Sequence, residues 1–307
     1  MHIWVDIKTL SDQHFQAIQK AFHGHDVSCD ESDRSLAEIA ILMPGLIHED
    51  FIKGMPHLKF VQCLTAGYDR ADLSVLAKRG IQFAYAKDVF SIQIAEDVVA
   101  KILFMNRRLG DYYDLMKEHT WQFKRVHHEI YGSTVGILGA GSIGREVAIR
   151  LKAFNCNIIG YKRTKIEDDI YDELVTDDKG LNHLYQVSDI IVVALPLTEQ
   201  THHFIDKDAF KQMKKTAILI NVARGDIIDQ DALMDALNHE QIRAAALDVT
   251  SPEPLMPDHP LWNTKHLFIT PHQASSSPMM HQRLIDEVID TCLKYINQEN
   301  LDNIVSL

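Results

Sequence analysis

Three polar side chains in the second half of the sequence are of the types that reduction of a keto acid requires. Arg224, Glu253 and His272 each follow an apolar run that is typical of a buried strand. An arginine can hold a carboxylate through two parallel hydrogen bonds and polarise a neighbouring ketone. A histidine can deliver a proton as a hydride arrives, and a glutamate beside it fixes the tautomer of the ring. Together these residue types indicate hydride transfer to a 2-keto acid.

Each of the three residues alone has a simpler explanation. Arg224 could cap a helix or form a salt bridge, Glu253 between two prolines could be an exposed loop acid, and His272 is one of 17 histidines. Ligands of open parallel sheets bind outside the carboxyl ends of the strands, however, so three such ends can converge on one crevice. Their joint placement therefore favours a catalytic site. The doublets His127-His128 and His202-His203 lack metal-ligand spacing, and we predict no metal site.

A glycine-rich turn predicts a dinucleotide site. The apolar run Thr134–Leu138 meets Gly139, Gly141 and Gly144 in GxGxxG spacing, a helical pattern follows, and a second apolar run occupies Asn157–Tyr161. The first glycine permits a tight turn, the second admits a pyrophosphate, and the third lets the helix pack on the strand. The helix N-terminus supplies free N–H groups to the phosphates. The predicted contacts at this turn are Gly139, Gly141, Ser142, Ile143 and Gly144.

The residues after the second run indicate which dinucleotide is bound. A carboxylate at this position would bond the adenosine ribose and repel a 2′-phosphate. The chain has Lys162, Arg163 and Thr164 there, and Glu167 and Asp168 come only later. Two cations and a hydroxyl favour NADP(H), with NAD(H) still possible. A solvated charge cluster in a loop is the alternative explanation.

The elements that must position these residues form two alternations of strands and helices. Such alternation predicts parallel sheets covered by helices on both faces, an α/β fold with two doubly wound domains. In residues 1–86 the predicted strands are His2–Asp6, Ile39–Met43, Phe60–Thr65 and Gln82–Tyr85, and the predicted helices are Asp12–Phe22, His48–Gly54 and Ala71–Lys78. The second alternation begins near Ser133 and continues to about Thr270.

Two further segments connect these alternations. A long apolar-periodic helix is predicted from Ser91 to Leu109, with Glu96 and Asp97 in its first part. After the second alternation, Gln273–Pro278 is small and polar and predicts a loop or hinge. An amphipathic helix over Met279–Asn297 follows, and its apolar stripe consists of Leu284, Ile285, Val288, Cys292 and Tyr295.

The composition excludes several classes of protein. The 307 residues are 46% hydrophobic and 24% charged, which excludes collagen, disorder and low complexity. The net charge of −12 disfavours binding to nucleic acid or to an anionic membrane. No apolar run reaches the length of a membrane span, and the N-terminus lacks the pattern of a secretory signal. The four cysteines form no CxxC motif, so we expect buried free thiols and a cytoplasmic location.

An ordered set of motifs resembles the D-isomer-specific 2-hydroxyacid dehydrogenases, which include the glyoxylate and hydroxypyruvate reductases. The resemblance covers nearly the whole chain and is strongest from Ser133 to Gln273. It implies that Arg224, Glu253 and His272 are the catalytic residues. The motifs are GxGxxG, LPLT at Leu195–Thr198, NVARG at Asn221–Gly225, LDV…EP at Leu247–Pro254 and PH at Pro271-His272.

The resemblance also implies binding residues. Asp248 matches a residue near the nicotinamide carboxamide, and further cofactor contacts fall on Leu195, Pro196, Thr201, Val222, Ala223 and Ala274. The substrate would be held by backbone N–H groups of a loop, Thr65, Ala66 and Gly67, together with Arg224 and His272. Trp121 also lies where many members have tryptophan. One departure is Gln273-Ala274-Ser275, where many members follow the histidine with two glycines.

The implied architecture is a Rossmann nucleotide domain, residues 93–277, inserted into a flavodoxin-like substrate domain, residues 1–92 and 278–307. The two domains would close over the substrate, and the family is usually dimeric through the nucleotide domain. The implied activity is an NADP(H)-preferring D-2-hydroxyacid dehydrogenase that reduces glyoxylate, hydroxypyruvate or a related 2-keto acid. Formate dehydrogenase is disfavoured because that relative pairs its histidine with glutamine. The absence of a further C-terminal domain disfavours a long allosteric phosphoglycerate dehydrogenase, and a non-enzymatic dinucleotide-sensing scaffold is the alternative.

Overall fold

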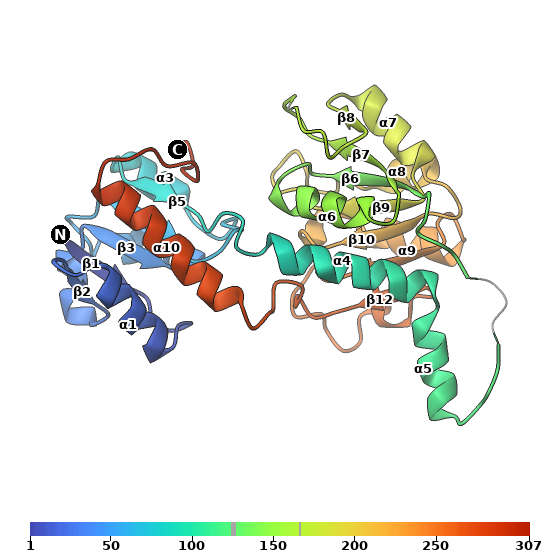
Figure 1. The fold of residues 1–307 in the computed structure, drawn as a ribbon, viewed down its shortest axis with the longest axis horizontal. Helices are drawn as coiled ribbons and strands as arrows, with labels where there is room; N and C mark the ends of the chain where they lie inside the picture. Colours follow the sequence, from blue (N-terminus) through green and yellow to red (C-terminus); the bar gives the residue numbers. More distant parts are fainter. Residues whose placement is uncertain (124–126, 166) are drawn as a thin grey trace. The chain divides into compact units, whose positions relative to one another are not determined.

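The computed structural model describes residues 1–123, 127–165 and 167–307, and it divides into two compact units. Unit 1 consists of Met1–Phe90 and Ser277–Leu307, and unit 2 is the inserted segment Ser91–Ser276 (Figure 1). These limits differ by one or two residues from the predicted domain limits. No helix among the described residues combines the length and the apolar character that crossing a membrane requires.

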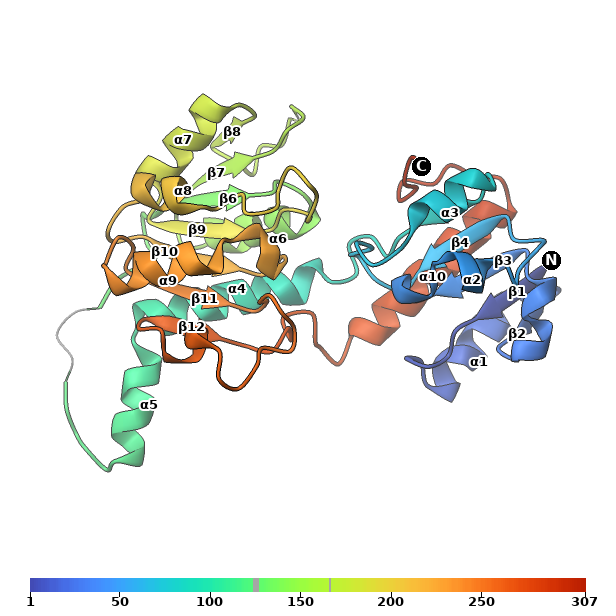
Figure 2. The same cartoon turned by 180° about the vertical axis from the view of Figure 1, so that it is seen from behind.

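Unit 1 is a five-stranded parallel sheet in the order β2-β1-β3-β4-β5. Residues alternate along β1, so Ile3 and Val5 pack on one face with α1 and α10, whereas Trp4 packs on the other face with α2 and α3. Figures 1 and 2 show these two helix pairs on opposite sides of the sheet. The bounds are β1 His2–Val5, α1 Asp12–Ala21, β2 Asp26–Ser28, β3 Ile39–Leu42, α2 Glu49–Ile52, β4 Phe60–Cys63, α3 Leu73–Lys78, β5 Gln82–Ala84 and α10 Met280–Ile296.

The C-terminal helix α10 completes the core of unit 1. Its buried positions include the predicted Leu284, Ile285, Val288 and Cys292. The fifth predicted position, Tyr295, stacks on Phe60 of β4 with ring centroids 4.1 Å apart. The apolar stripe is therefore what returns the end of the chain to the sheet with which the chain began.

Unit 2 is a seven-stranded parallel sheet in the order β12-β11-β10-β9-β6-β7-β8. The chain leaves the centre of this sheet in both directions, and the direction changes between β6 and β9, as in a Rossmann fold. The strands are β6 Thr134–Leu138, β7 Asn157–Tyr161, β8 Glu173–Val175, β9 Ile190–Val193, β10 Ile218–Asn221, β11 Ala244–Leu247 and β12 Leu267–Ile269.

Helices cover both faces of this sheet. Apolar residues of α7, α8 and α9 enter the main core cluster on one face, and α4 packs beside α6 on the other (Figures 1 and 2). The two α/β sheets confirm the predicted fold class. The helices are α4 Ser91–Asn106, α5 Leu109–Lys117, α6 Ser142–Lys152, α7 Asp178–Val187, α8 Lys207–Gln212 and α9 Gln230–Asn238, and short 3₁₀ turns occupy Glu31–Leu36, Pro44–Leu46, Gly225–Ile227 and Pro260–Asn263.

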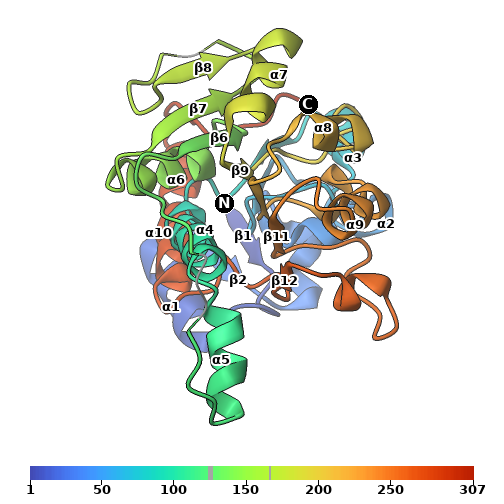
Figure 3. The same cartoon turned by 90° about the vertical axis from the view of Figure 1, so that its right-hand side faces the viewer.

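The predicted long helix is wrong in its last turn. α4 ends at Asn106, Arg108 adopts a left-handed conformation with φ of 54°, and α5 starts anew at Leu109. Asn106 is the last buried residue of α4, and its amide oxygen accepts from Arg243 at 2.6 Å. Beyond it the chain has no sheet to pack on, and α5 points away from the sheet of unit 2 (Figure 3).

The prediction of buried thiols is wrong for one cysteine. Cys29 is partly exposed, whereas Cys63, Cys156 and Cys292 are buried and reduced. Burial raises the pKa of Cys156 to about 11, which leaves this thiol protonated at neutral pH. The predicted strands also omit β2 and β8, which are short strands at the edges of their sheets, and β9, which lies in the middle of its sheet.

Candidate active site

Apart from the cations after β7, the predicted site residues of unit 2 follow five neighbouring strands of one parallel sheet. Because parallel strands end at the same edge, the five segments after them leave the sheet side by side. In the sheet order, β10, β11 and β12 are adjacent, so Arg224, Glu253 and His272 follow three consecutive strands. The segments are Gly139–Gly141 after β6, Leu195–Thr201 after β9, Val222–Gly225 after β10, Asp248–Glu253 after β11 and Thr270–Ala274 after β12.

His272 and Glu253 form a direct side-chain pair. The distance from Nδ1 of His272 to Oε2 of Glu253 is 2.8 Å. The other oxygen of Glu253 accepts the backbone N–H of Thr250 at 3.1 Å, which holds the carboxylate in place. With Nδ1–H donated to the carboxylate, Nε2 is the ring nitrogen that can exchange a proton. The ring is 46% exposed, so a ligand can reach it.

The buried carboxylate of Asp248 organises the loop that carries His272. It is 2% exposed and accepts hydrogen bonds from the Thr270 hydroxyl at 2.5 Å and from the N–H groups of Gln273 at 3.1 Å and Ala274 at 2.9 Å. The backbone oxygen of Asp248 accepts the N–H of His272 at 2.7 Å. These bonds hold His272 in a left-handed conformation with φ of 50°.

Arg224 is placed by a turn that requires its neighbouring glycine. A Cβ on Gly225 would lie 2.1 Å from the carbonyl carbon of Thr250, so only glycine lets the segments after β10 and β11 approach this closely. The fully buried Asn221 supports the turn, accepting from the N–H of Ala223 at 3.0 Å and donating to the Arg224 oxygen at 2.9 Å. The close approach brings the Arg224 and Glu253 segments together.

The glycine turn fits a dinucleotide. Gly139 has φ of +108°, and a Cβ there would lie 2.5 Å from the oxygen of Ala194. A Cβ on Gly144 would lie 2.2 Å from the oxygen of Gly139, so this glycine allows α6 to pack on the turn. Around Gly141 a Cβ would meet no protein atom within 4 Å, which leaves open space for a pyrophosphate. The first helical bond of α6 runs from Arg145 N–H to Gly141, and the N–H groups before it can bind phosphate.

The segment after β7 presents cations to solvent. Lys162 donates its backbone N–H to Val175 at 3.1 Å, and Arg163 and Thr164 are exposed. Within the part of the chain that the structure describes, neither Lys162 nor Arg163 forms an ion pair. The nearby acid Asp168 is paired with Arg145 of α6 at 2.9 Å. Positive charge is therefore available at the end of β7.

The remaining predicted cofactor residues form the walls of this sheet edge. Leu195, Val222, Ala223 and Ala274 are buried, and Pro196 is exposed. Thr201 is also buried, and its hydroxyl donates to the oxygen of Pro196 at 2.6 Å and accepts the N–H of Thr198 at 2.7 Å. The Thr201 side chain therefore holds the loop after β9 in its own conformation.

The predicted substrate loop lies in unit 1, at the carboxyl end of β4. The Thr65 hydroxyl donates to the oxygen of Gly67 at 2.6 Å and lies 3.3 Å from the sulfur of Cys63, whose pKa is raised by burial. Among the described residues no group accepts the backbone N–H of Ala66 or Gly67. The loop therefore offers two N–H donors that an anionic ligand could use.

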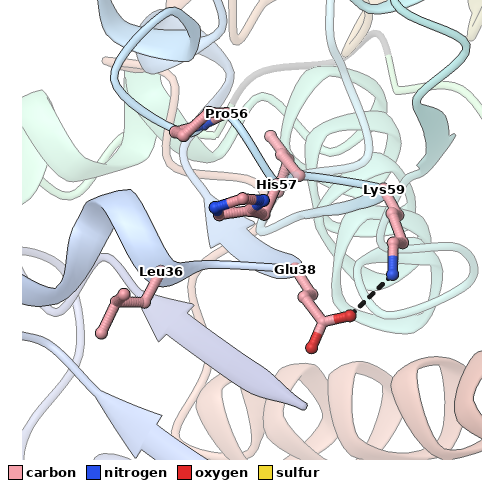
Figure 4. Close-up of a pocket in the computed structure, with 6 residues that line it drawn as sticks. Leu36, Glu38, Pro56, His57 and Lys59 are labelled. Atoms are coloured by element: carbon pink, nitrogen blue, oxygen red, sulfur yellow. Dashed lines mark hydrogen bonds and ion pairs between the residues drawn. The ribbon is translucent and has the colours of Figure 1, made fainter.

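A separate pocket in unit 1 lies at the opposite edge of the same sheet. Glu38 and Lys59 line it immediately before β3 and β4 and form an ion pair of 2.7 Å (Figure 4). Because Thr65 follows β4, the two edges are distinct, and this pocket contains none of the predicted site residues. No cluster of metal-ligating side chains was found among residues 1–123, 127–165 and 167–307.

Comparison with known proteins identifies the family. The profile "D-isomer specific 2-hydroxyacid dehydrogenase, NAD binding domain" matches residues 99–274. The chain belongs to the D-isomer-specific 2-hydroxyacid dehydrogenases. It is 32% identical over 270 residues to a glyoxylate reductase of Korarchaeum cryptofilum, covering 86% of this chain and 81% of the relative. It is 39% identical over 225 residues to human glyoxylate reductase/hydroxypyruvate reductase, covering 72% and 69%.

A solved structure supports the same assignment. The D-isomer-specific 2-hydroxyacid dehydrogenase of Xanthobacter autotrophicus Py2, determined with NADPH and MES, superposes with a TM-score of 0.84 at 25% identity. The match covers 99% of this chain and 98% of that one. The chain is therefore a nicotinamide-dinucleotide-binding oxidoreductase of this family, as its motifs predict.

Two residues on which the geometry depends were given no role by the sequence motifs. Asn221 holds the turn at Arg224, and Thr270 bonds the carboxylate of Asp248. A signal was present in the sequence, because each is a polar residue at the end of an otherwise apolar run. Such a residue has its backbone in or beside the sheet and its side chain free to bond the next loop.

Replacing Gly225 with alanine tests the close approach of the Arg224 and Glu253 segments. We expect Gly225→Ala to lower the free energy of unfolding by ~1–3 kcal/mol, because the new methyl group must displace the backbone of Thr250. Urea denaturation measures the change. Gly45→Ala is the matched control, since its Cβ would meet nothing within 4 Å. Equal stability of the two variants would refute the close packing.

Proposed function

We propose that this protein is an NADPH-preferring reductase of small 2-keto acids such as glyoxylate and hydroxypyruvate. The observation that carries the proposal is the 2.8 Å pair of His272 and Glu253 on the strand ends beside Arg224. A fixed cation next to an imidazole–carboxylate pair provides substrate binding and proton delivery at one sheet edge. The relatives from Korarchaeum cryptofilum and human are named as reductases of this substrate class.

The residues divide the reaction between them. When bound, the reduced nicotinamide supplies the hydride. Arg224 binds the carboxylate of the keto acid and polarises its ketone, and His272 donates a proton from Nε2 to the ketone oxygen. Glu253 accepts the Nδ1–H of His272 and stabilises the charged ring before the proton is given up. In unit 1, the N–H groups of Ala66 and Gly67 are the expected donors to an anionic substrate group.

The preference for NADPH rests on the segment after β7. Arg163 and Thr164 are exposed there, and no acid occupies the position that would bond the ribose hydroxyls. The carboxylate of Asp168, which follows a few residues later in the sequence, is paired with Arg145. A 2′-phosphate would gain charge-assisted hydrogen bonds from Lys162 and Arg163, whereas NADH would gain none. NADH therefore remains a slower substrate.

The cofactor preference can be tested at Arg163. We expect wild-type protein to oxidise NADPH faster than NADH with glyoxylate or hydroxypyruvate. Arg163→Ala should lower kcat/KM for NADPH by about 10–100-fold, as loss of one charge-assisted hydrogen bond implies, and leave the value for NADH nearly unchanged. Lys207→Ala, at the exposed start of α8, is the control. A wild-type preference for NADH across all acceptors would contradict the proposal.

The catalytic roles can be tested at His272 and Arg224. His272→Gln and Arg224→Ala should each lower kcat/KM by about 10²–10⁴-fold, because each removes a group that stabilises the transition state. Circular dichroism should show an unchanged fold, since neither side chain belongs to the core. Activity close to wild type in either variant would show the role to be wrong. Wild-type protein that binds NADPH but reduces no 2-keto acid would instead support a dinucleotide sensor.

We also propose that the protein is a homodimer formed through the arm of unit 2, which we define as Leu109–Phe123. α5 projects from the sheet (Figure 3), and the arm exposes several large apolar side chains. Clusters of exposed apolar residues of this kind mark interaction sites. A second copy would cover both arms by one symmetric contact. The exposed side chains are Leu109, Tyr113, Met116, Trp121 and Phe123.

The dimer can be tested by placing charge on the arm. We expect light scattering to give the mass of two chains for wild-type protein and of one chain for Tyr113→Asp/Met116→Asp, because two buried carboxylates cost more than the contact provides. Met279→Asp, at an exposed position of unit 1, is the control and should remain dimeric. A monomeric wild-type protein at micromolar concentration would rule out this contact.

A further inference from the structure

One face of α4 carries three polar side chains that are withdrawn from solvent. Gln93 is 5% exposed, Lys101 is 2% exposed, and the side chain of Asp97 is 15% exposed. Their spacing of four residues places all three on one side of the helix. A buried lysine is costly unless it is paired and hydrogen-bonded, so a stripe of this kind has to have fixed partners.

The partners of this stripe are Asp248, which follows β11, and the loop that carries His272. Lys101 forms an ion pair with Asp97, and its Nζ lies 3.6 Å from Oδ1 of Asp248. The second oxygen of Asp97 accepts a hydrogen bond from the side-chain amide of Gln273 at 2.8 Å. The backbone N–H of Gln273 is bonded in turn to Oδ1 of Asp248 at 3.1 Å. The four residues close a ring of polar contacts.

A second bond ties the same loop to α4. The side-chain amide of Gln93 donates to the backbone oxygen of Ser275 at 3.1 Å. Gln273 and Ser275 thus flank the short turn after His272, and both are anchored to one helix. The turn lies outside any helix or strand. These bonds and those to Asp248 hold it in place. Its position therefore depends on the polar stripe.

The anchored turn matters because of the residue that precedes it. His272 has a left-handed backbone, which a non-glycine residue adopts only when its surroundings hold it there. The backbone of Gln273 follows directly, so a displacement of Gln273 turns the His272 ring with respect to Glu253. We propose that Lys101, Asp97 and Gln273 are positioning residues that hold the His272 loop against α4 in the geometry required for proton transfer.

The charges in the ring of polar contacts formed by Lys101, Asp97, Gln273 and Asp248 explain why a lysine is required. Asp97 and Asp248 are both acceptors in this network, and without a cation between them their charges would repel. Lys101 contacts both carboxylates, and Asp248 also accepts the N–H groups of Gln273 and Ala274. The lysine thereby supports the loop through a carboxylate, without touching the loop itself.

The ring of polar contacts gives the Gln273 side chain a role. Its amide N–H group meets Asp97, although the two residues are 176 positions apart in the chain. The glutamine therefore ties the turn after His272 to a helix.

The inference rests on the proposed function, in which His272 delivers the proton. Reversing the direction of the hydrogen bond between Gln273 and Asp97 tests the inference. Gln273→Glu places a carboxylate against Asp97, so kcat for 2-keto acid reduction should fall about 10-fold or more. Asp97→Asn/Gln273→Glu keeps the total charge and lets the new amide donate to the new carboxylate. This double variant should recover kcat to within about threefold of wild type.

The controls separate positioning from stability. Gln16→Glu, at an exposed site of α1, makes the same chemical change elsewhere and should leave kcat unchanged. KM for NADPH and the thermal midpoint of Gln273→Glu should stay near wild type, because the Gln273 side chain is exposed and forms one hydrogen bond, to Asp97. Gln273→Ala, which only removes the amide, provides a second variant and should also lower kcat.

Two kinetic results would overturn the inference. One is a wild-type kcat in both Gln273→Glu and Gln273→Ala, and the other is a double variant as slow as Gln273→Glu. Crystal structures of the single and double Glu variants give a readout that needs no turnover. The Thr270–Ala274 segment should move in the first and return in the second. Wild-type protein without turnover would refute the proposed function alone, and an unmoved segment would refute the positioning role.

Discussion

Parallel pairing throughout each sheet is the constraint from which the rest of the structure follows. Because every strand of unit 2 runs in one direction, the chain leaves all seven at the same edge. The glycine turn, the Arg224 turn and the His272 loop therefore meet without any long excursion of the chain. The strands fix only where each loop begins, so the conformations of the loops determine the chemistry.

Among the groups that fix the loop conformations, the buried carboxylate of Asp248 forms the most hydrogen bonds to the His272 loop. Asp248 is almost completely removed from water, so its charge has to be satisfied by donors from the protein. The donors come from the Thr270 hydroxyl, from two backbone N–H groups after His272, and from Lys101 of α4 nearby. A residue that we expect to lie beside the cofactor is thus also the anchor of the His272 loop.

The sequence predicts the elements better than the contacts between them. Apolar runs place most strands of both sheets, and the stripe on α10 lies on residues that pack in unit 1. The break at Arg108 is missed because the apolar periodicity continues through it, and burial ends there only in three dimensions. The bond between Asp97 and Gln273 is missed because no local pattern relates residues 176 positions apart. Strand ends are local properties, whereas polar networks depend on packing.

The net charge of −12 sets a last requirement on the site. The proposed reductase has to admit a dinucleotide and a keto acid, both of them anions, at a sheet edge where Asp248 and Glu253 follow β11 and Asp97 of α4 contacts the His272 loop. Lys101 offsets one of these charges from within the core, and the pairing of Glu253 with His272 disperses another when the ring is protonated. Arg224 and the cations after β7 are then left to act on the ligands. Each carboxylate that the protein neutralises internally, as Lys101 does for Asp248, is one that does not compete with the substrate for the partly exposed Arg224.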